Sequence, residues 1–177
     1  MTGRRRALFG AVAGAAVLAG AGGALWRERR AADDAAPAAA VQAFWRLRFA
    51  TPDGGELVLA GFRGRPLLLN FWATWCPPCV REMPALDRFQ RAHAARGWQV
   101  LGLAVDRAEP VREFLRRTPV SFPIGLAGLD GTALSRTLGN SAGALPFSVV
   151  FDAAGEVRQR HLGETSETVL ERFAALF

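Results

Sequence analysis

The 177-residue sequence predicts an α/β fold, in which helices cover both faces of a central sheet with mixed strand directions. Short apolar runs alternate along the chain with segments whose apolar residues recur every three or four positions, a pattern typical of buried strands separated by helices. One hairpin pattern near each end of the body adds antiparallel strands to that sheet. The chain length, at roughly 150 residues per domain, predicts one domain with an extension.

The first thirty residues differ from the rest in charge. They contain six arginines and one acid, whereas residues 31–177 contain sixteen arginines and fifteen acids, so most of the net charge of +6 lies at the N-terminus. A body this close to neutrality lacks the basic surface that tracks phosphates, and we therefore expect no nucleic-acid partner.

An uncharged run of twenty residues, 7–26, lies between two arginine clusters. As a helix it would extend about 30 Å, the thickness of the hydrocarbon core of a bilayer. Residues 1–30 are therefore predicted to be a signal anchor that holds the domain on the periplasmic side of the cytoplasmic membrane. The alternative is a signal peptide whose cleavage releases the domain into the periplasm.

The body begins with a predicted linker and a hairpin. Residues 31–43 are small, with two acids and one proline, which is typical of a linker, and the folded domain is predicted over 44–177. Trp45–Ala50 and Glu56–Ala60 alternate in polarity around a turn, as a β-hairpin does. Leu67–Phe71 is a continuous apolar run, which predicts a strand buried on both faces.

A long helix is expected next, from Cys76 or Pro77 to Arg96, because apolar residues recur at three-residue steps and Gly97 is a stop signal. The remaining predicted elements, in order, are a strand at Trp98–Val105, a helix at Glu109–Arg117, a short strand at Phe122–Ile124, a helix at Thr132–Leu138, a hairpin of Phe147–Asp152 and Glu156–His161, and a terminal helix at Ser166–Phe177.

The motif Trp75-Cys76-Pro77-Pro78-Cys79 carries the chemistry. Cysteines three residues apart in a first helical turn share a face, close enough for a disulfide. Cys76 would stand at the helix N-terminus, where unpaired amides and the helix dipole stabilise a thiolate. In such motifs the thiol pKa falls from about 8.5 to between ~3.5 and ~7. We therefore expect Cys76 to be the nucleophile and Cys79 the resolving thiol.

Three other interpretations of the cysteine pair stay open. A static structural disulfide is disfavoured, because closing so short a loop removes little chain entropy. A copper(I)-binding chaperone could use the two thiolates without turnover. A peroxiredoxin-like peroxidase is disfavoured by the adjacent pair. Two cysteines are too few for a four-cysteine metal site, and neither His93 nor His161 is placed near the motif, so we expect no metal and no cofactor.

The segment Leu68–Cys79, LLNFWATWCPPC, and the following Glu82-Met83-Pro84 resemble the thioredoxin fold. More narrowly, they are similar to the TlpA/ResA branch of membrane-attached, extracytoplasmic thiol–disulfide oxidoreductases. The resemblance covers roughly 44–177 and implies a thioredoxin-like three-layer sandwich with an N-terminal hairpin and an inserted helical segment. It also implies reduction of client-protein disulfides in cytochrome c maturation or copper-centre assembly, with a membrane thiol donor as reductant.

The resemblance assigns roles to further residues. Pro146 matches the family's cis-proline, which lies beside the cysteines and, with the neighbouring Leu145, leaves backbone available to a substrate strand. Glu82 matches an acidic residue that would accept the proton of Cys79, and this role needs a pKa raised by burial. Trp75 would form an apolar docking surface over the cysteines.

Two positions depart from the pattern of related proteins. Asn70 stands where cytoplasmic thioredoxins carry a buried aspartate, and an amide cannot accept a proton as a carboxylate does, which favours Glu82 as the base. Phe147, after the proline, is bulkier than the small polar residue often found there, which indicates a different substrate preference.

Overall fold

The computed structural model describes residues 38–177. The predicted membrane segment and the first part of the predicted linker lie outside the described residues. None of the helices found over 38–177 is both long enough and apolar enough to span a bilayer.

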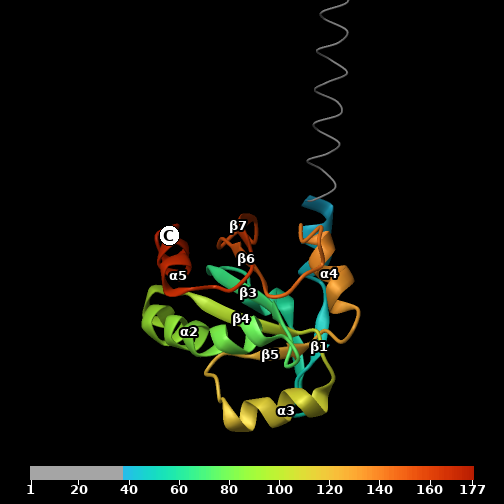
Figure 1. Ribbon diagram of the computed structural model, residues 1–177. Coiled ribbons are helices and arrows are strands. Elements are labelled where there is room, and N and C mark those ends of the chain that lie inside the picture. Colours follow the sequence, from blue (N-terminus) through green and yellow to red (C-terminus); the bar gives the residue numbers. More distant parts are fainter. Residues whose placement is uncertain (1–37) are drawn as a thin grey trace, which may run out of the picture. The chain divides into compact units, whose positions relative to one another are not determined.

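A seven-stranded mixed sheet with the order β2-β1-β5-β4-β3-β6-β7 forms the centre of the domain (Figure 1). Strands β3, β4 and β5 run parallel to one another, and every other neighbouring pair is antiparallel. The strands are β1 (Arg48–Ala50), β2 (Glu56–Val58), β3 (Leu67–Trp72), β4 (Gln99–Ala104), β5 (Ile124–Leu126), β6 (Phe147–Phe151) and β7 (Val157–Leu162). From β1 onward, the predicted order of strands and helices is confirmed.

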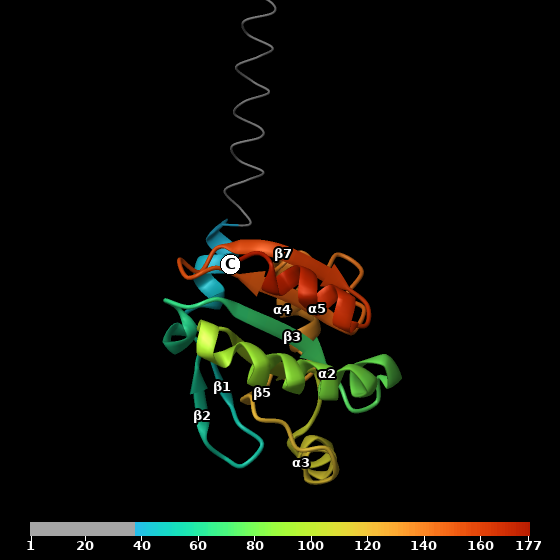
Figure 2. The ribbon, with the colours of Figure 1, turned by 90° about the vertical axis from the view of Figure 1, so that its left-hand side faces the viewer.

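Helices cover both faces of this sheet. Helices α2 and α5 lie together on one face and α4 on the other, as the two perpendicular views show (Figures 1 and 2). The helices are α2 (Pro77–His93), α3 (Ala108–Arg117), α4 (Gly131–Thr137) and α5 (Glu167–Ala174), with 3-10 turns at Leu59–Phe62 and Ala94–Arg96. The predicted three-layer α/β sandwich is confirmed.

Strand β3 shows how the sequence builds two cores. Side chains alternate along a strand, so Leu67, Leu69 and Phe71 enter the cluster on the α4 face. Leu68 and Trp72 enter the cluster under α2, α3 and α5. All six residues of the strand are buried, as the continuous apolar run predicted. Asn70 has the same parity as Leu68 and Trp72, which places a polar side chain beneath α2.

The first described residues differ from the expected linker. The chain is helical over 38–44, and Val41 and Phe44, three positions apart, bury their side chains in the core on the α4 face. The Phe44 ring stacks on that of Phe151 at a centroid distance of 5.4 Å. Alanines surround these two residues, so the apolar periodicity was too sparse to indicate a helix.

The N-terminal hairpin is shorter than predicted. Strand β1 begins only at Arg48, because residues 45–46 form a turn after the helix over 38–44. Strand β2 ends at Val58, where the chain enters a 3-10 turn. Helix α2 ends at His93, three residues before its predicted end at Arg96. A 3-10 turn over Ala94–Arg96 then leads to the predicted stop, Gly97, which has the left-handed conformation at φ 87°.

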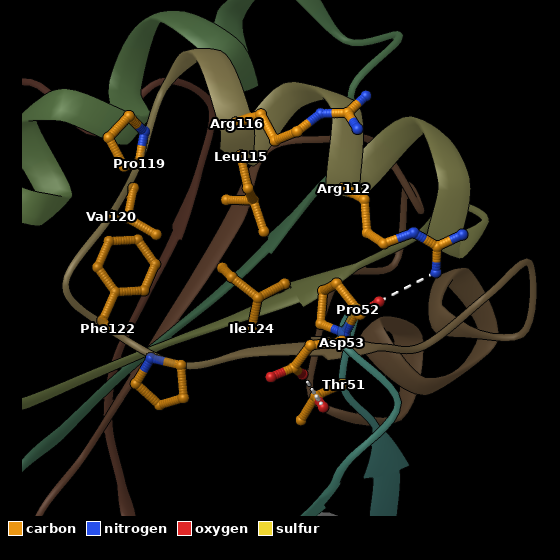
Figure 3. A pocket seen from close by; sticks show the side chains of 11 residues that line it. Thr51, Pro52, Asp53, Arg112, Leu115, Arg116, Pro119, Val120, Phe122 and Ile124 are labelled. Carbon is orange, nitrogen blue, oxygen red and sulfur yellow. Dashed lines mark hydrogen bonds between the residues drawn. The ribbon is translucent and has the colours of Figure 1, made fainter.

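A hollow of about 570 Å³ opens between α3 and the turn that follows β1 (Figure 3). Leu115, Phe122 and Ile124 supply apolar lining, and Arg112 at its edge donates a hydrogen bond of 3.0 Å to the Pro52 carbonyl. No residue of α2 lines it. The hollow is therefore separate from the two cysteines.

Candidate active site

The two cysteines lie where β3 passes into α2. Strand β3 ends at Trp72, and after three residues Cys76 becomes the N-cap of α2. Pro77 and Pro78 occupy the first two helical positions, which suits them because N–H groups there have no partner within the helix. The predicted start of the helix is confirmed. Because proline has no N–H, the first backbone N–H within the helix is that of Cys79, and the positive end of the helix dipole lies at Cys76.

Cys76 and Cys79 form a disulfide, with Cα atoms 5.3 Å apart. Cys79 is fully buried, whereas Cys76 keeps 5% of its surface exposed. The structure is thus the oxidised state of a dithiol, and Cys76 offers the sulfur that another molecule can reach.

Asp106, just after β4, fixes the loop that leads into α2. Its Oδ2 accepts hydrogen bonds from the backbone N–H of Thr74 at 3.1 Å and from the Thr74 hydroxyl at 2.5 Å. Its other oxygen accepts from the N–H of Arg107 at 2.8 Å. Because β4 is parallel to β3 and adjacent to it, this carboxylate lies beside the end of β3. Sequence reasoning did not assign Asp106 this role.

The residues expected to receive a substrate lie around this turn. The Leu145–Pro146 peptide bond is cis, as the resemblance implied. Phe147, which follows it, pairs with Phe71 near the end of β3, so the cis-proline lies at the same end of the sheet as the cysteines. Leu145 is half-buried and contacts both core clusters. Trp75 exposes 63% of its surface, so its ring is not part of the core.

Glu82 is buried, with 1% of its surface exposed, three residues after Cys79 on the same side of α2. Burial raises the pKa of its carboxyl group from 4.5 to about 7, and the nearby charge of Glu164 adds to this rise. Hydrogen bonds from Thr165 and Asn70 oppose it. The elevated pKa that a proton acceptor needs is thus present, and both protonation states are populated near neutral pH.

Three neighbours complete a buried polar cluster around Glu82. Its Oε2 accepts from the Thr165 N–H at 2.6 Å, and its Oε1 accepts from Asn70 Nδ2 at 2.8 Å. Asn70 Nδ2 also donates to Ser148 Oγ at 3.1 Å. Sequence reasoning missed Ser148 and Thr165. A serine within the apolar strand Phe147–Phe151 is the signal that could have found the first, because a polar side chain there must have a buried partner.

Clusters of three or more side chains able to bind a metal are absent from the part of the chain that the structure describes. His93 lies at the end of α2, where its ring packs on Phe89, and His161 lies in β7, where its ring packs on Phe173. The two thiols are therefore the reactive groups of this site.

Comparisons with known proteins agree with this geometry. The Redoxin family model matches residues 31–176. A thiol-disulfide oxidoreductase ResA of Bacillus cereus is 31% identical over 122 residues, which are 68% of each chain. ResA of Geobacillus kaustophilus is 34% identical over 122 residues, 67% of each chain.

Solved structures share the fold. A thiol:disulfide interchange protein of the thioredoxin family from Chlorobium tepidum TLS superimposes with a TM-score of 0.63 at 28% identity, covering 73% of this chain and 91% of that one. A thioredoxin-related protein from Neisseria meningitidis serogroup B gives a TM-score of 0.64 at 34% identity, covering 72% and 96%. The fold is thioredoxin-like, and the chain belongs to the Redoxin family, among its ResA-like thiol–disulfide oxidoreductases.

Proposed function

We propose that this oxidoreductase reduces disulfide bonds in client proteins on the outer side of the cytoplasmic membrane. The observation that carries the proposal is the Cys76–Cys79 disulfide at the start of α2, with a buried carboxyl group, Glu82, one turn further along. A dithiol in this place can take up and release two electrons without any cofactor.

The reaction begins from the reduced protein. The Cys76 thiolate, stabilised by the positive end of the α2 dipole, attacks one sulfur of the client disulfide, and the client's other sulfur leaves as a thiolate. Cys79 then attacks the Cys76 sulfur of the mixed disulfide and displaces the second client thiolate. The client gains two electrons and two protons, and the enzyme returns to the disulfide form.

Glu82 acts in the second half of this reaction. Cys79 is fully buried, so its thiol needs a nearby base before it can attack. With a pKa of about 7, the Glu82 carboxylate takes that proton and later returns it to solvent. Asn70, across the cluster, has no group that could serve as the base.

The client docks beside the cysteines. The exposed ring of Trp75 offers apolar contact on one side of Cys76. The backbone of Leu145, just before the cis-proline, offers hydrogen bonds to an extended client segment. In this arrangement, Trp75 and Leu145 select the client, while the sulfur chemistry is the same for all clients.

The N-terminal segment determines where the domain works. Residues 7–26 hold the domain to the cytoplasmic membrane, or are part of a cleaved signal peptide, and the domain faces the periplasm. A membrane thiol donor returns the enzyme to its reduced form. Family resemblance supports clients in cytochrome c maturation or copper-centre assembly.

Trapping of mixed disulfides tests the assigned roles. Cys79→Ser should accumulate disulfide-linked clients, because Cys76 still attacks and nothing resolves the product. Cys76→Ser should trap none. Non-reducing electrophoresis of membranes and periplasm, followed by mass spectrometry, would identify the clients. Equal trapping by the two variants would refute the assignment of Cys76 as the nucleophile and Cys79 as the resolving thiol.

A further inference from the structure

Two large apolar side chains are more exposed than any others among the described residues. Trp75 exposes 63% of its surface and Leu129 exposes 82%. Trp75 directly precedes Cys76, whereas Leu129 lies in the loop between β5 and α4. A single exposed leucine is common on protein surfaces and by itself indicates no function. The position of Leu129 relative to Trp75 is what connects it to the reaction.

Strand pairing places both side chains at the same end of the sheet. Strands β3, β4 and β5 are parallel neighbours (Figure 1). Trp72, Ala104 and Leu126 are direct partners across these three strands, so they form one row. Trp75 and Leu129 each follow this row by three residues. Leu129 is therefore the counterpart of Trp75, two strands away from the active-site turn.

The loop that contains Leu129 is fixed to the end of β4. The Ala127 N–H donates to the Ala104 carbonyl oxygen at 2.9 Å, which continues the pairing of the two strands. Gly128 follows in the left-handed conformation at φ 58°, and its carbonyl oxygen accepts from the Gly131 N–H at 3.2 Å. Leu129 is thus held in a tight turn, with its side chain directed into solvent.

Leu129 and Leu145 flank the reactive sulfur from opposite sides. Leu145 lies just before β6, which pairs with β3 on one side, whereas β5 lies beyond β4 on the other side. A client whose backbone pairs with Leu145 and whose sulfur reaches Cys76 contacts Trp75 next. Continued in extended form, the client segment runs toward Leu129.

The spacing of the strands determines which client residue arrives at Leu129. Strands β3 and β5 are two strand spacings apart, which is about 10 Å, and an extended chain advances ~3.3 Å per residue. The third residue from the client's cysteine therefore lies beside Leu129. Arg107, the corresponding residue after β4, is exposed between the two apolar side chains. Its methylene groups can contact the client while its charge stays in water.

We propose that Leu129 is a specificity-determining residue, which receives an apolar side chain located three residues from the reactive cysteine of the client. The inference rests on the function proposed above and defines the client segment that the site prefers. That segment is extended, and its apolar residue lies on the side of the cysteine that faces β5. Clients with a polar residue there react more slowly, because the sulfur chemistry is unchanged and only the contact is lost.

Symmetric disulfide dimers of short peptides test the proposal. Each peptide contains one central cysteine in a background of serine and glycine, with a single leucine placed at one position before or after the cysteine. The reduced full chain is mixed with each dimer, and the released peptide thiol is quantified after acid quenching. A leucine at the third position, on one side of the cysteine only, should raise the second-order rate constant about fivefold over the leucine-free peptide.

Substitutions assign this acceleration to one side chain. Leu129→Ser should abolish it and leave the rate with the leucine-free peptide unchanged, whereas Leu129→Met should retain it. Leu176→Ser is the matched control, because Leu176 is also exposed but lies at the other end of α2, where Arg96 donates to the neighbouring Phe177 carbonyl oxygen. Alkylation of Cys76 by iodoacetamide should be equally fast in all variants.

The possible outcomes separate this inference from the proposed function. An acceleration that survives Leu129→Ser would overturn the role of Leu129, because another surface would then receive the client side chain. Equal rates for every leucine position would overturn it as well, while reduction of the peptides by Cys76 would still support disulfide exchange. If the reduced protein reduces none of the peptides, the proposed function fails together with the inference.

Discussion

Glu82 is a side chain whose charge the fold disfavours. Its pKa is raised from 4.5 to about 7, so the folded protein binds this proton more tightly than the unfolded chain. The contribution of Glu82 to stability is therefore largest below pH 4.5 and is lost as the pH rises through about 7. A group retained at such a cost fits a role in proton transfer.

Glu82→Gln should remove this penalty. Above pH 7 the variant should have a higher free energy of unfolding than the unmodified protein, by about 3 kcal/mol, because one pKa unit corresponds to ~1.36 kcal/mol. Near pH 4.5 the difference should vanish. Chemical denaturation of the oxidised proteins at several pH values would measure it, with the exposed Glu171→Gln as the control. An equal gain at both ends of the pH range would contradict the buried charge as its cause.

Asp106 supports the active-site loop from outside the motif. Three hydrogen bonds converge on its carboxylate, two from Thr74 and one from Arg107. Asp106→Ala should lower the free energy of unfolding by about 2 kcal/mol, because it leaves donors without an acceptor. It should also slow disulfide exchange by roughly tenfold, since the loop no longer holds Cys76 in place.

Insulin reduction and denaturation, measured together, would test this role. The matched control is Asp130→Ala, because Asp130 is the N-cap of α4 but its side chain makes no capping hydrogen bond. That variant should keep both its rate and its stability. If Asp106→Ala loses stability but exchanges disulfides at the normal rate, Asp106 only holds the fold together.

At the scale of elements, β4 packs closely against neighbouring side chains at Gly102. A Cβ atom added at Gly102 would lie 2.5 Å from Ile124 Cδ1 and 3.1 Å from Trp72 Nε1. Gly102→Ala should therefore cost about 1–3 kcal/mol of stability through overpacking, measured by thermal or chemical denaturation. Gly61→Ala is the control, since its added Cβ would meet nothing within 4 Å. If Gly102→Ala leaves the stability unchanged, β5 can move away freely.

The elements that were predicted best are those with a long sequence pattern or with two independent signals. Strand β3 and helix α2 follow from a continuous apolar run, a periodic segment and a glycine stop, all of which are local signals. The helix over 38–44 was missed because only two of its residues are buried, and one of them, Phe44, stacks on Phe151, more than a hundred positions away. Tertiary contacts of this kind leave little trace in a local pattern.

The candidate site divides in the same way. The spacing of Cys76 and Cys79 at the start of one helix placed the two thiols together, whereas Glu82, further along the same helix, was assigned through the family resemblance. Ser148 and Thr165 join the site through strand pairing and a loop, and nothing in their local sequence indicates Glu82 as the partner. The same holds for Asp106, whose contact with Thr74 depends on β3 and β4 being neighbours.

At the scale of the whole molecule, the sheet separates two cores, one of which contains the reactive groups. The cysteines and the Glu82 cluster belong to the face covered by α2, α3 and α5. On the opposite face Phe44 stacks on Phe151. Among the described residues of that core, Leu145 alone was given a role at the site, and it contacts both cores. Stability can therefore be changed on one face while the chemistry on the other is preserved.

Phe44→Ala tests this separation. Removing a buried phenylalanine should cost about 3–5 kcal/mol of stability, and denaturation would measure that loss. The alkylation rate of reduced Cys76 and its pH dependence should stay at the values of the unmodified protein under conditions where the variant is folded. Leu170→Ala truncates a side chain of α5 in the core beneath the active site and should lower stability. It should also shift the pH at which Glu82 is half protonated, because α5 directly follows the loop that contains Thr165. A change in Cys76 alkylation caused by Phe44→Ala would mean that the sheet transmits strain from one core to the other, and that the two faces work as a single unit.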